Sequence, residues 1–249
     1  MGTLVTGASS GIGREIAITL SSSRSVIIHG RNRTRLEETL KNCSPGNHKI
    51  WECDFEQVNE IGESLKNQIM ATRQPISEFV HCAGIPSVGS ARLLDLNQLQ
   101  KAMNVNTFSA LEIISSLLKK NINQTAIQRV VFISSIWSQF GSIGHSVYSA
   151  TKGALDSAMR SLAVELAPKV RINSLSLGAI HTPMSANALS DPGIRQHTEA
   201  NYPLGIGTTE SAAKACEFLL SEDSKWITGQ VIVVDGGRTS HMSNKILNV

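Results

Sequence analysis

Hydrophobic and polar residues alternate with two different spacings along this chain. Short runs rich in valine and isoleucine are separated by longer segments in which apolar residues recur at helical spacing. The short runs predict seven strands, at residues 3–6, 25–29, 49–53, 79–82, 129–134, 171–176 and 231–235. The longer segments predict six helices, at residues 11–22, 34–42, 58–72, 96–119, 147–167 and 211–221. This order predicts an α/β fold in which helices cover both faces of a doubly wound, seven-stranded parallel sheet.

The chain reads as a single domain over residues 1–249, because no linker, repeat or low-complexity tract divides it. Only residues 178–209 lack a clear period, and this stretch contains Pro183, Pro192 and Pro203. A long irregular segment in a compact domain is usually functional, often as a lid. We therefore expect a substrate loop at about residues 178–209.

Composition narrows the classes of function. The net charge is only +3, with 17% charged residues and no long Lys/Arg run, so we expect no nucleic-acid or membrane partner. No apolar run approaches the length of a membrane span. Four dispersed cysteines, without a Cys-x-x-Cys pair, and seven scattered histidines argue against a disulfide framework and against a metal site. These features predict a cytoplasmic protein with reduced thiols.

A glycine-rich turn follows the first predicted strand, in the segment Thr6-Gly-Ala-Ser-Ser-Gly-Ile-Gly13. Glycines allow the backbone to turn tightly and to approach a pyrophosphate, and the following helix N-terminus supplies amide donors. A structural turn can also collect glycines, but this one lies between the first strand and the first helix of an α/β chain. The position predicts a dinucleotide site.

The end of the second strand indicates which dinucleotide is bound. In Ile28-His-Gly-Arg-Asn-Arg33 there is no acidic residue that could bind the ribose hydroxyls of NAD. Gly30 leaves room there, and the Arg31 guanidinium is suited to the 2′-phosphate of NADP. We therefore expect NADP(H) rather than NAD(H), against the alternative that Arg31 is merely a solvated loop residue.

Tyr148 and Lys152 are the strongest candidates for chemistry. They are four residues apart in a predicted helix, so both side chains lie on one helix face. A nearby ammonium favours the phenolate and would lower the tyrosine pKa, which suits proton exchange near neutral pH. Such pairs also occur as ordinary solvated helix faces. Their value here comes from the other motifs in the chain.

Taken together, these motifs resemble the short-chain dehydrogenase/reductase family over almost the whole chain, from Thr6 to Gly237. The resemblance implies a single Rossmann fold of residues 1–249, and an oxidoreductase that interconverts ketones and secondary alcohols. It also implies a catalytic tetrad of Asn106, Ser135, Tyr148 and Lys152. The cofactor-binding residues it implies are Gly7, Ser9, Ser10, Gly11, Ile12, Gly13, Arg31, Asp54, Phe55, Cys82, Ala83, Gly84, Tyr148, Lys152, Gly178, Ile180 and Thr182.

The resemblance assigns a role to each member of the tetrad. Ser135 would stabilise the developing charge on the substrate oxygen, and Tyr148 would transfer the proton. Lys152 would bind the nicotinamide ribose and hold down the tyrosine pKa. Asn106 would seat a water that links the lysine to solvent.

Two departures from the family pattern concern the cofactor site. Cys82 stands where the family commonly has an asparagine that ties neighbouring strands together, which puts that hydrogen-bonding role in doubt. Leu177 precedes Gly178 where a proline is usual. Neither change touches the tetrad.

The substrate is less defined. We expect Ser135, Trp137, Gln139 and His145 to contact it, with His145 also interpretable as a plain turn residue. The general resemblance is to bacterial 3-oxoacyl-acyl-carrier-protein reductases, which predicts a ketone, alcohol or acyl thioester substrate. Reduction of a sugar-type or other polar ketone is an alternative, and a non-enzymatic NADP sensor or scaffold is another. The resemblance further implies a homo-oligomer, a dimer or tetramer paired through residues 96–119, 147–167 and the last strand.

Overall fold

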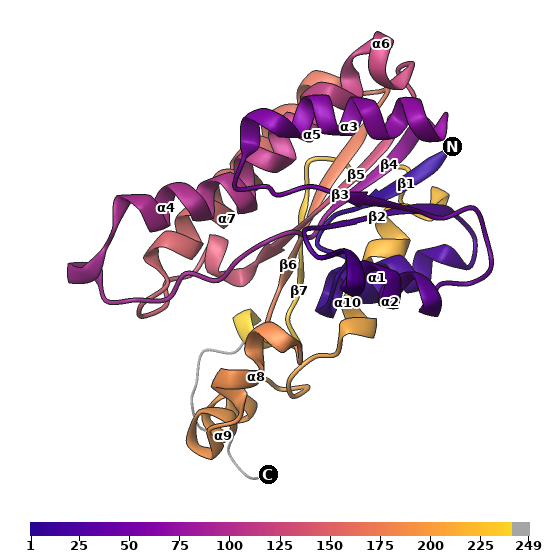
Figure 1. Ribbon diagram of the computed structural model, residues 1–249. Helices are drawn as coiled ribbons and strands as arrows, with labels where there is room; N and C mark the ends of the chain where they lie inside the picture. The colour runs from indigo at the N-terminus through magenta and orange to yellow at the C-terminus, as the bar shows by residue number, and fades with distance from the viewer. Residues whose placement is uncertain (241–249) are drawn as a thin grey trace.

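The seven predicted strands form one parallel sheet (Figure 1). The computed structural model describes residues 1–240, and residues 241–249, for which the sequence indicates no role, lie outside the described residues. The strand order is β3-β2-β1-β4-β5-β6-β7. Their bounds are β1 Gly2–Val5, β2 Ser25–Gly30, β3 Lys49–Glu52, β4 Ile76–His81, β5 Arg129–Ser135, β6 Arg171–Leu177 and β7 Val231–Val234. The order reverses between β1 and β4, where doubly wound sheets bind ligands outside the strand carboxyl ends.

Helices cover both faces of the sheet, as predicted. One face packs against α1 Gly11–Ser21, α2 Arg33–Asn42 and α10 Thr209–Leu219, and the other against α3 Val58–Thr72, α5 Ser109–Leu118 and α7 Ser146–Leu166. Successive strand residues point to opposite faces. Leu4 therefore enters the core under α3, α5 and α7, whereas Val5 enters the core under α1 and α10. Burial on both faces explains the nearly continuous apolar runs of the strands.

The prediction of one continuous helix over residues 96–119 is wrong, because the helix is interrupted. The structure divides it into α4 Leu96–Met103, a π-helical turn η2 Asn104–Phe108, and α5. A π turn holds an additional residue, and hydrophobic spacing does not reveal it. Asn104 donates a hydrogen bond to the Glu56 carbonyl at 2.9 Å, and the completely buried Asn106 lies in the same turn.

The segment 178–209 was predicted to be irregular, and this prediction is also wrong. It contains two helices, α8 Pro183–Leu189 and α9 Pro192–Ala200, which extend beyond the carboxyl edge of the sheet (Figure 1). Each begins with proline in its first turn, where the missing N–H costs nothing. Thr182 and Asp191 cap the two helices by accepting amide hydrogen bonds from the first turn. The prolines therefore start helices here instead of interrupting them.

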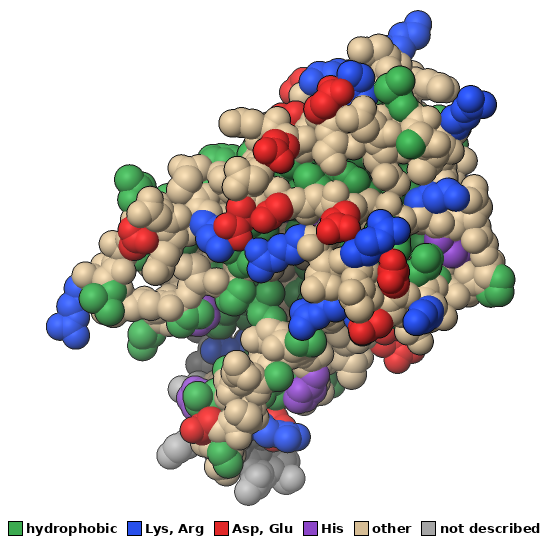
Figure 2. Space-filling view, viewed as in Figure 1, with side chains coloured by type: hydrophobic (Ala, Val, Ile, Leu, Met, Phe, Trp, Pro, Cys, Tyr) green, Lys and Arg blue, Asp and Glu red, His purple; other side chains and the backbone are tan. Residues whose placement is uncertain are grey.

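The surface charges and the short helical turns do not point to any function beyond the predicted one. Figure 2 shows acidic and basic side chains interspersed over the visible face. Among residues 1–240, no helix has the length and apolar character that crossing a bilayer requires. The remaining short helical turns are η1 Ala91–Leu93, α6 Lys120–Asn123, η3 Ile136–Ser138, η4 Glu222–Ser224 and η5 Arg238–Ser240.

Candidate active site

Two cavities flank the glycine-rich turn at the carboxyl edge of the sheet. One, of about 210 Å³, lies over the ends of β2 and β3, and the other, of about 330 Å³, lies over β5 and β6. Gly84, which follows β4, lines both. The arrangement can therefore hold an elongated ligand that crosses the reversal point of the sheet.

The glycine-rich turn is built so that no side chain would fit at two of its positions. Gly7 has a φ of +67°, and a Cβ there would lie 2.8 Å from the Ala83 backbone. A Cβ on Gly13 would lie 2.4 Å from the Gly7 carbonyl oxygen. The turn leads into α1, whose Ser10 N-cap makes no side-chain hydrogen bond and whose first turn has no acidic residue. An anionic diphosphate fits this uncapped helix N-terminus.

The cavity over β2 and β3 brings together many of the predicted cofactor residues. Gly7, Ser9, Arg31, Asp54, Phe55, Ala83 and Gly84 all line it. Sequence reasoning missed other residues of this lining, namely His29, Gly30 as a contact, Arg35, Cys53, Ile85 and Val105. Arg35 lies four residues after Arg31 in the same short basic segment, which was the available signal. The cavity thus has two guanidinium groups.

Arg31 is held by an acidic partner. Its Nη1 forms a 3.0 Å ion pair with Glu56 Oε1, and Lys101 of α4 reaches the same oxygen at 2.8 Å. The Arg31 side chain is 63% exposed. The guanidinium can therefore turn toward a phosphate, but it must leave or share Glu56 to do so.

Buried histidines lie beside this cavity. The His29 ring stacks on Phe55, with ring centroids 3.9 Å apart and planes 9° from parallel, and its Nε2 is 3.1 Å from the Cys53 carbonyl. Burial lowers the pKa of His29 and of His81 to about 3. Both rings are thus neutral at physiological pH and serve to pack and hydrogen-bond the strand ends.

The Thr6 side chain ties neighbouring strands together next to Cys82. The Thr6 hydroxyl accepts hydrogen bonds from the Cys82 and Ala83 amides, at 3.1 and 3.2 Å, and lies 3.2 Å from His81 Nδ1. Thr6 therefore joins the ends of β1 and β4 without an asparagine. Burial raises the pKa of the Cys82 thiol to about 12, so the thiol is neutral where it lines the second cavity.

Three members of the tetrad meet in the second cavity. Ser135 ends β5, and Tyr148 and Lys152 project from α7 toward it. Lys152 Nζ lies 5.8 Å from the centre of the Tyr148 ring and donates a 2.8 Å hydrogen bond to the Ile133 carbonyl. The same cavity is lined by six other predicted cofactor residues, Ile12, Cys82, Gly84, Gly178, Ile180 and Thr182.

The pKa values correct one expectation. Burial raises the pKa of Tyr148 to about 12, and the neighbouring Ser135 hydroxyl only partly opposes this rise. Burial also lowers the pKa of Lys152 to about 8. The raised pKa of Tyr148 differs from the expected lowering because burial of the phenol outweighs its stabilising neighbours, and the Lys152 ammonium is directed at the Ile133 carbonyl. Tyr148 is a proton donor over the whole neutral range.

Asn106 is placed behind the other three residues. Its Oδ1 accepts from the Ile85 amide at 2.8 Å, and its Nδ2 donates to the Ile85 carbonyl and to Thr151 Oγ1, at 3.1 and 3.0 Å. Thr151 in turn donates to the Tyr148 carbonyl at 2.7 Å. The Asn106 side chain thereby links the π turn, the segment after β4 and α7. Its role in seating a water stays a prediction.

The predicted substrate residues separate into two groups. Ser135, Trp137 and His145 line the second cavity, with the Trp137 and His145 rings 5.8 Å apart. Gln139 is exposed and lines neither this cavity nor the cofactor cavity.

Three predicted cofactor residues also line neither cavity. These are Ser10, Gly11 and Gly13, which lie in the glycine-rich turn and the first residues of α1.

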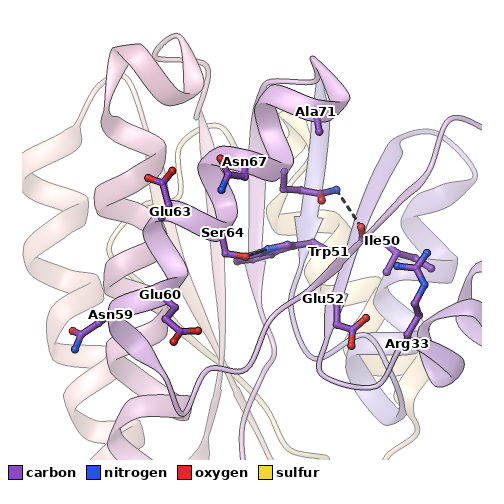
Figure 3. Close-up of a pocket in the computed structure, with 11 residues that line it drawn as sticks. Arg33, Ile50, Trp51, Glu52, Asn59, Glu60, Glu63, Ser64, Asn67 and Ala71 are labelled. Atoms are coloured by element: carbon purple, nitrogen blue, oxygen red, sulfur yellow. Dashed lines mark hydrogen bonds between the residues drawn. The ribbon is translucent and has the colours of Figure 1, made fainter.

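A further cavity of about 760 Å³ lies between β3 and α3, at the edge of the sheet (Figure 3). Two pairs of its polar groups are hydrogen-bonded within the protein. The Trp51 indole donates to Ser64 at 2.9 Å, and the Gln68 amide donates to the Ile50 carbonyl at 3.1 Å. No member of the tetrad lines it. Among residues 1–240, no group of three His, Cys, Asp or Glu side chains is arranged to hold a metal ion.

A phosphate-binding turn next to a Ser–Tyr–Lys site, on a doubly wound parallel sheet, defines a nicotinamide-dependent oxidoreductase. A family model described as enoyl-(acyl carrier protein) reductase matches residues 7–239. The chain belongs to the short-chain dehydrogenase/reductase family, whose members bind NAD(P)(H) and act on alcohol and ketone groups.

Individual relatives are similar over nearly their full length. A 3-oxoacyl-acyl-carrier-protein reductase of Aquifex aeolicus (strain VF5) is 35% identical over 244 residues, which cover 94% of this chain and 95% of the relative. An L-xylulose reductase of Bos taurus is 30% identical over 243 residues, covering 94% of each chain. The crystal structure of a putative gluconate dehydrogenase from Agrobacterium tumefaciens superposes with a TM-score of 0.90 at 25% identity, covering 97% and 96% of the two chains.

Proposed function

We propose that this protein is an NADP(H)-dependent reductase of a polar ketone, and the corresponding dehydrogenase in reverse. The observation on which this rests most is the common cavity of Ser135, Tyr148 and Lys152, which adjoins the cofactor turn through Gly84. When bound, the nicotinamide supplies or accepts the hydride. The chain itself must then orient the carbonyl, deliver a proton and exclude competing water.

Each residue has a task that its position supports. Ser135, at the end of β5, would donate a hydrogen bond to the substrate oxygen as negative charge develops on it. Tyr148 would transfer its phenolic proton to the same oxygen, since its raised pKa keeps it protonated. Lys152 would exchange its bond to the Ile133 carbonyl for one to the cofactor ribose. Asn106 would hold the π turn and α7 in register around them.

The preference for NADP(H) is supported by two guanidinium groups. Arg31 and Arg35 both line the cofactor cavity beyond the end of β2. The acid in its lining, Asp54, follows β3 and is engaged by the Glu56 amide at 3.0 Å. A 2′-phosphate would therefore meet two cations at the end of β2 and no carboxylate from that strand.

Two substrate classes have support. The 35% identity to a 3-oxoacyl-acyl-carrier-protein reductase supports a 3-oxoacyl thioester. The 30% identity to an L-xylulose reductase supports a polyol-type ketone. The cleft favours the polar class, because the cavity beyond Trp137 is lined by Ser142, His145, His197, Thr198 and Asn201. The hydroxyl groups of a polyol-type substrate can hydrogen-bond to such a lining, whereas a long apolar acyl chain cannot.

The deciding experiment measures oxidation of NADPH and of NADH with a panel of polar ketones, ketoses and a 3-oxoacyl thioester. We expect NADPH-dependent turnover that is lost in Tyr148→Phe while NADPH binding is retained. Turnover that survives Tyr148→Phe would contradict the role of the phenol. NADPH binding without turnover of any ketone would instead favour the sensor alternative.

We also propose that the protein is a cytoplasmic homo-oligomer. All four cysteines are free thiols, as is usual in a reducing compartment. On α4 and α7, Leu96, Leu99 and Val164 are exposed although they are large and apolar. A surface of this kind is typical of a protein interface. Light scattering on the purified protein tests this proposal, and a monomer at all concentrations would contradict it.

A further inference from the structure

The substrate cavity continues outward beyond the tetrad. A second cavity, of about 460 Å³, shares Ser135, Trp137, His145 and Gly178 with the catalytic cavity and extends along α9 to η5. Its outer end is formed by residues that lie far apart in the sequence. These are Ile194, His197, Thr198, Asn201, Tyr202 and Arg238.

This outer end is rigidly built. The Tyr202 hydroxyl accepts a 2.8 Å hydrogen bond from the Ala179 amide, and the Leu204 amide donates to the Gly236 carbonyl at 3.1 Å. A Cβ on Gly178 would lie 2.7 Å from the Tyr202 ring. The end of α9 and the turn before Arg238 are thus fixed against the segment that follows β6.

The charge of the cleft is of one sign. Its two linings contain Lys152 at the catalytic end and Arg238 at the outer end, and no aspartate or glutamate. Within residues 1–240, Arg238 forms no ion pair. Asp235, the acid nearest to it in sequence, accepts hydrogen bonds from the Gly237 and Thr239 amides, at 3.0 and 2.6 Å.

We infer that Arg238 binds a carboxylate of the substrate, so that the substrate is a keto acid or the corresponding hydroxy acid. This inference rests on the proposed function, because it concerns the substrate of that same site. A guanidinium binds a carboxylate through two parallel hydrogen bonds, and a cleft without acidic groups does not repel the anion.

A carboxylate fits better than a phosphate at this place. Phosphate sites commonly use helix N-termini, but α9 presents its C-terminal end here, at Asn201. The negative end of that helix dipole disfavours a dianion more than a monoanion. One guanidinium also balances one negative charge. The Thr198 hydroxyl donates to the Ile194 carbonyl at 2.8 Å, so it can accept a hydrogen bond from a neighbouring hydroxyl group of the substrate, and His197 lines the same end of the cavity.

Binding can be tested without turnover. The wild-type protein is saturated with the oxidised nicotinamide nucleotide, so that a ketone binds but cannot be reduced. Calorimetry then compares levulinate and the next two longer straight-chain keto acids with their methyl esters. We expect at least one acid to bind about tenfold or more tightly than its ester, because the ester loses the charge-assisted hydrogen bonds.

Variants assign that difference to one residue. Arg238→Met should abolish the preference for acids, and Arg238→Lys should retain part of it. Arg195→Met is the matched control, since Arg195 lies on α9 but is paired with Glu199 at 2.9 Å outside the cleft lining. It should leave the preference unchanged. In turnover assays, Arg238→Met should raise KM for the acid and leave kcat nearly unchanged.

Several outcomes would overturn the inference. Equal binding of acids and esters, no measurable binding of either, or a preference that persists in Arg238→Met would each do so. Tighter binding of hydroxyacetone phosphate than of every keto acid would overturn the carboxylate assignment. Failure of the proposed function looks different, because it is the absence of NADPH-dependent turnover with any ketone, whatever binds.

Discussion

Arg31 forms a 3.0 Å ion pair with Glu56, whose carboxylate oxygen also receives Lys101 at 2.8 Å. A 2′-phosphate and Glu56 therefore compete for one guanidinium, while Lys101 partly neutralises Glu56. Exposed ion pairs contribute no more than about 1 kcal/mol. Glu56 therefore competes only weakly with the phosphate, and one substitution at Glu56 would remove this competition.

We expect Glu56→Gln to tighten NADPH binding by roughly twofold to fivefold, which corresponds to the free energy of such a pair. Arg31→Met should weaken NADPH binding by about tenfold or more and change NADH binding little. Fluorescence titration with both nucleotides measures the effects. An equal change for NADPH and NADH in either variant would contradict the assignment of Arg31 to the 2′-phosphate.

Gly13→Ala should abolish nucleotide binding or prevent folding. The new Cβ would lie 2.4 Å from the Gly7 carbonyl oxygen and 2.7 Å from its carbon, so the backbone of the turn must move. Gly89→Ala is the matched control, since nothing lies within 4 Å of a Cβ there. Circular dichroism separates loss of folding from loss of binding. Normal NADPH affinity in folded Gly13→Ala would show that the turn is more adaptable than its packing indicates.

The parts of the site that sequence reasoning predicted are local in the chain. The turn from Gly7 to Gly13 is readable from glycine spacing, and Tyr148 and Lys152 from the helical repeat. Their convergence with Ser135 follows from the parallel sheet, because strand carboxyl ends lie at one edge. This is why the fold could be predicted, and why most of the residues expected to bind the cofactor lie together at the two cavities.

What could not be predicted depends on contacts between distant segments or on backbone detail. The π turn around Asn106 leaves no mark on the hydrophobic period. Prolines at 183 and 192 have the same appearance in sequence whether they break helices or begin them. Arg238 joins the cleft only because the turn after β7 packs against the end of α9. The lowered pKa of Lys152 depends on burial, which no short motif specifies.

The two buried histidines should make the protein sensitive to acid. Burial lowers the pKa of His29 and His81 from 6.5 to about 3, so between these values the unfolded chain binds protons that the folded chain does not. The free energy of unfolding should therefore fall as pH decreases below about 6.5, by about 1.4 kcal/mol per pH unit for each histidine.

Urea unfolding across the acid range measures this slope. His29→Phe should remove about half of it, because phenylalanine can stack on Phe55 without binding a proton. His81→Asn should do the same while retaining a polar partner for Thr6. Variants whose stability falls with acid as steeply as that of the wild type would show that other groups dominate the acid response.

The pH dependence of ketone reduction should be set by Lys152 and not by Tyr148. Tyr148, with a pKa of about 12, stays protonated and able to donate across the neutral and mildly alkaline range. Lys152, with a pKa of about 8, loses its charge within that range. Its ammonium favours the phenolate that forms as the proton leaves, so the protonated lysine is the active form. We therefore expect kcat/KM for reduction to be constant below pH 8 and to fall about tenfold per pH unit above it.

Lys152→Arg provides the decisive comparison, because a guanidinium stays charged throughout this range. Its kcat/KM should be lower than that of the wild type, since the longer planar group does not fit the buried position from which the lysine would reach the cofactor ribose, but the decline above pH 8 should disappear. Lys152→Met should be slow at every pH and likewise show no decline. Circular dichroism at each pH confirms that the proteins remain folded. A decline that persists in Lys152→Arg would assign it to another group and would leave the lysine with a role in binding alone.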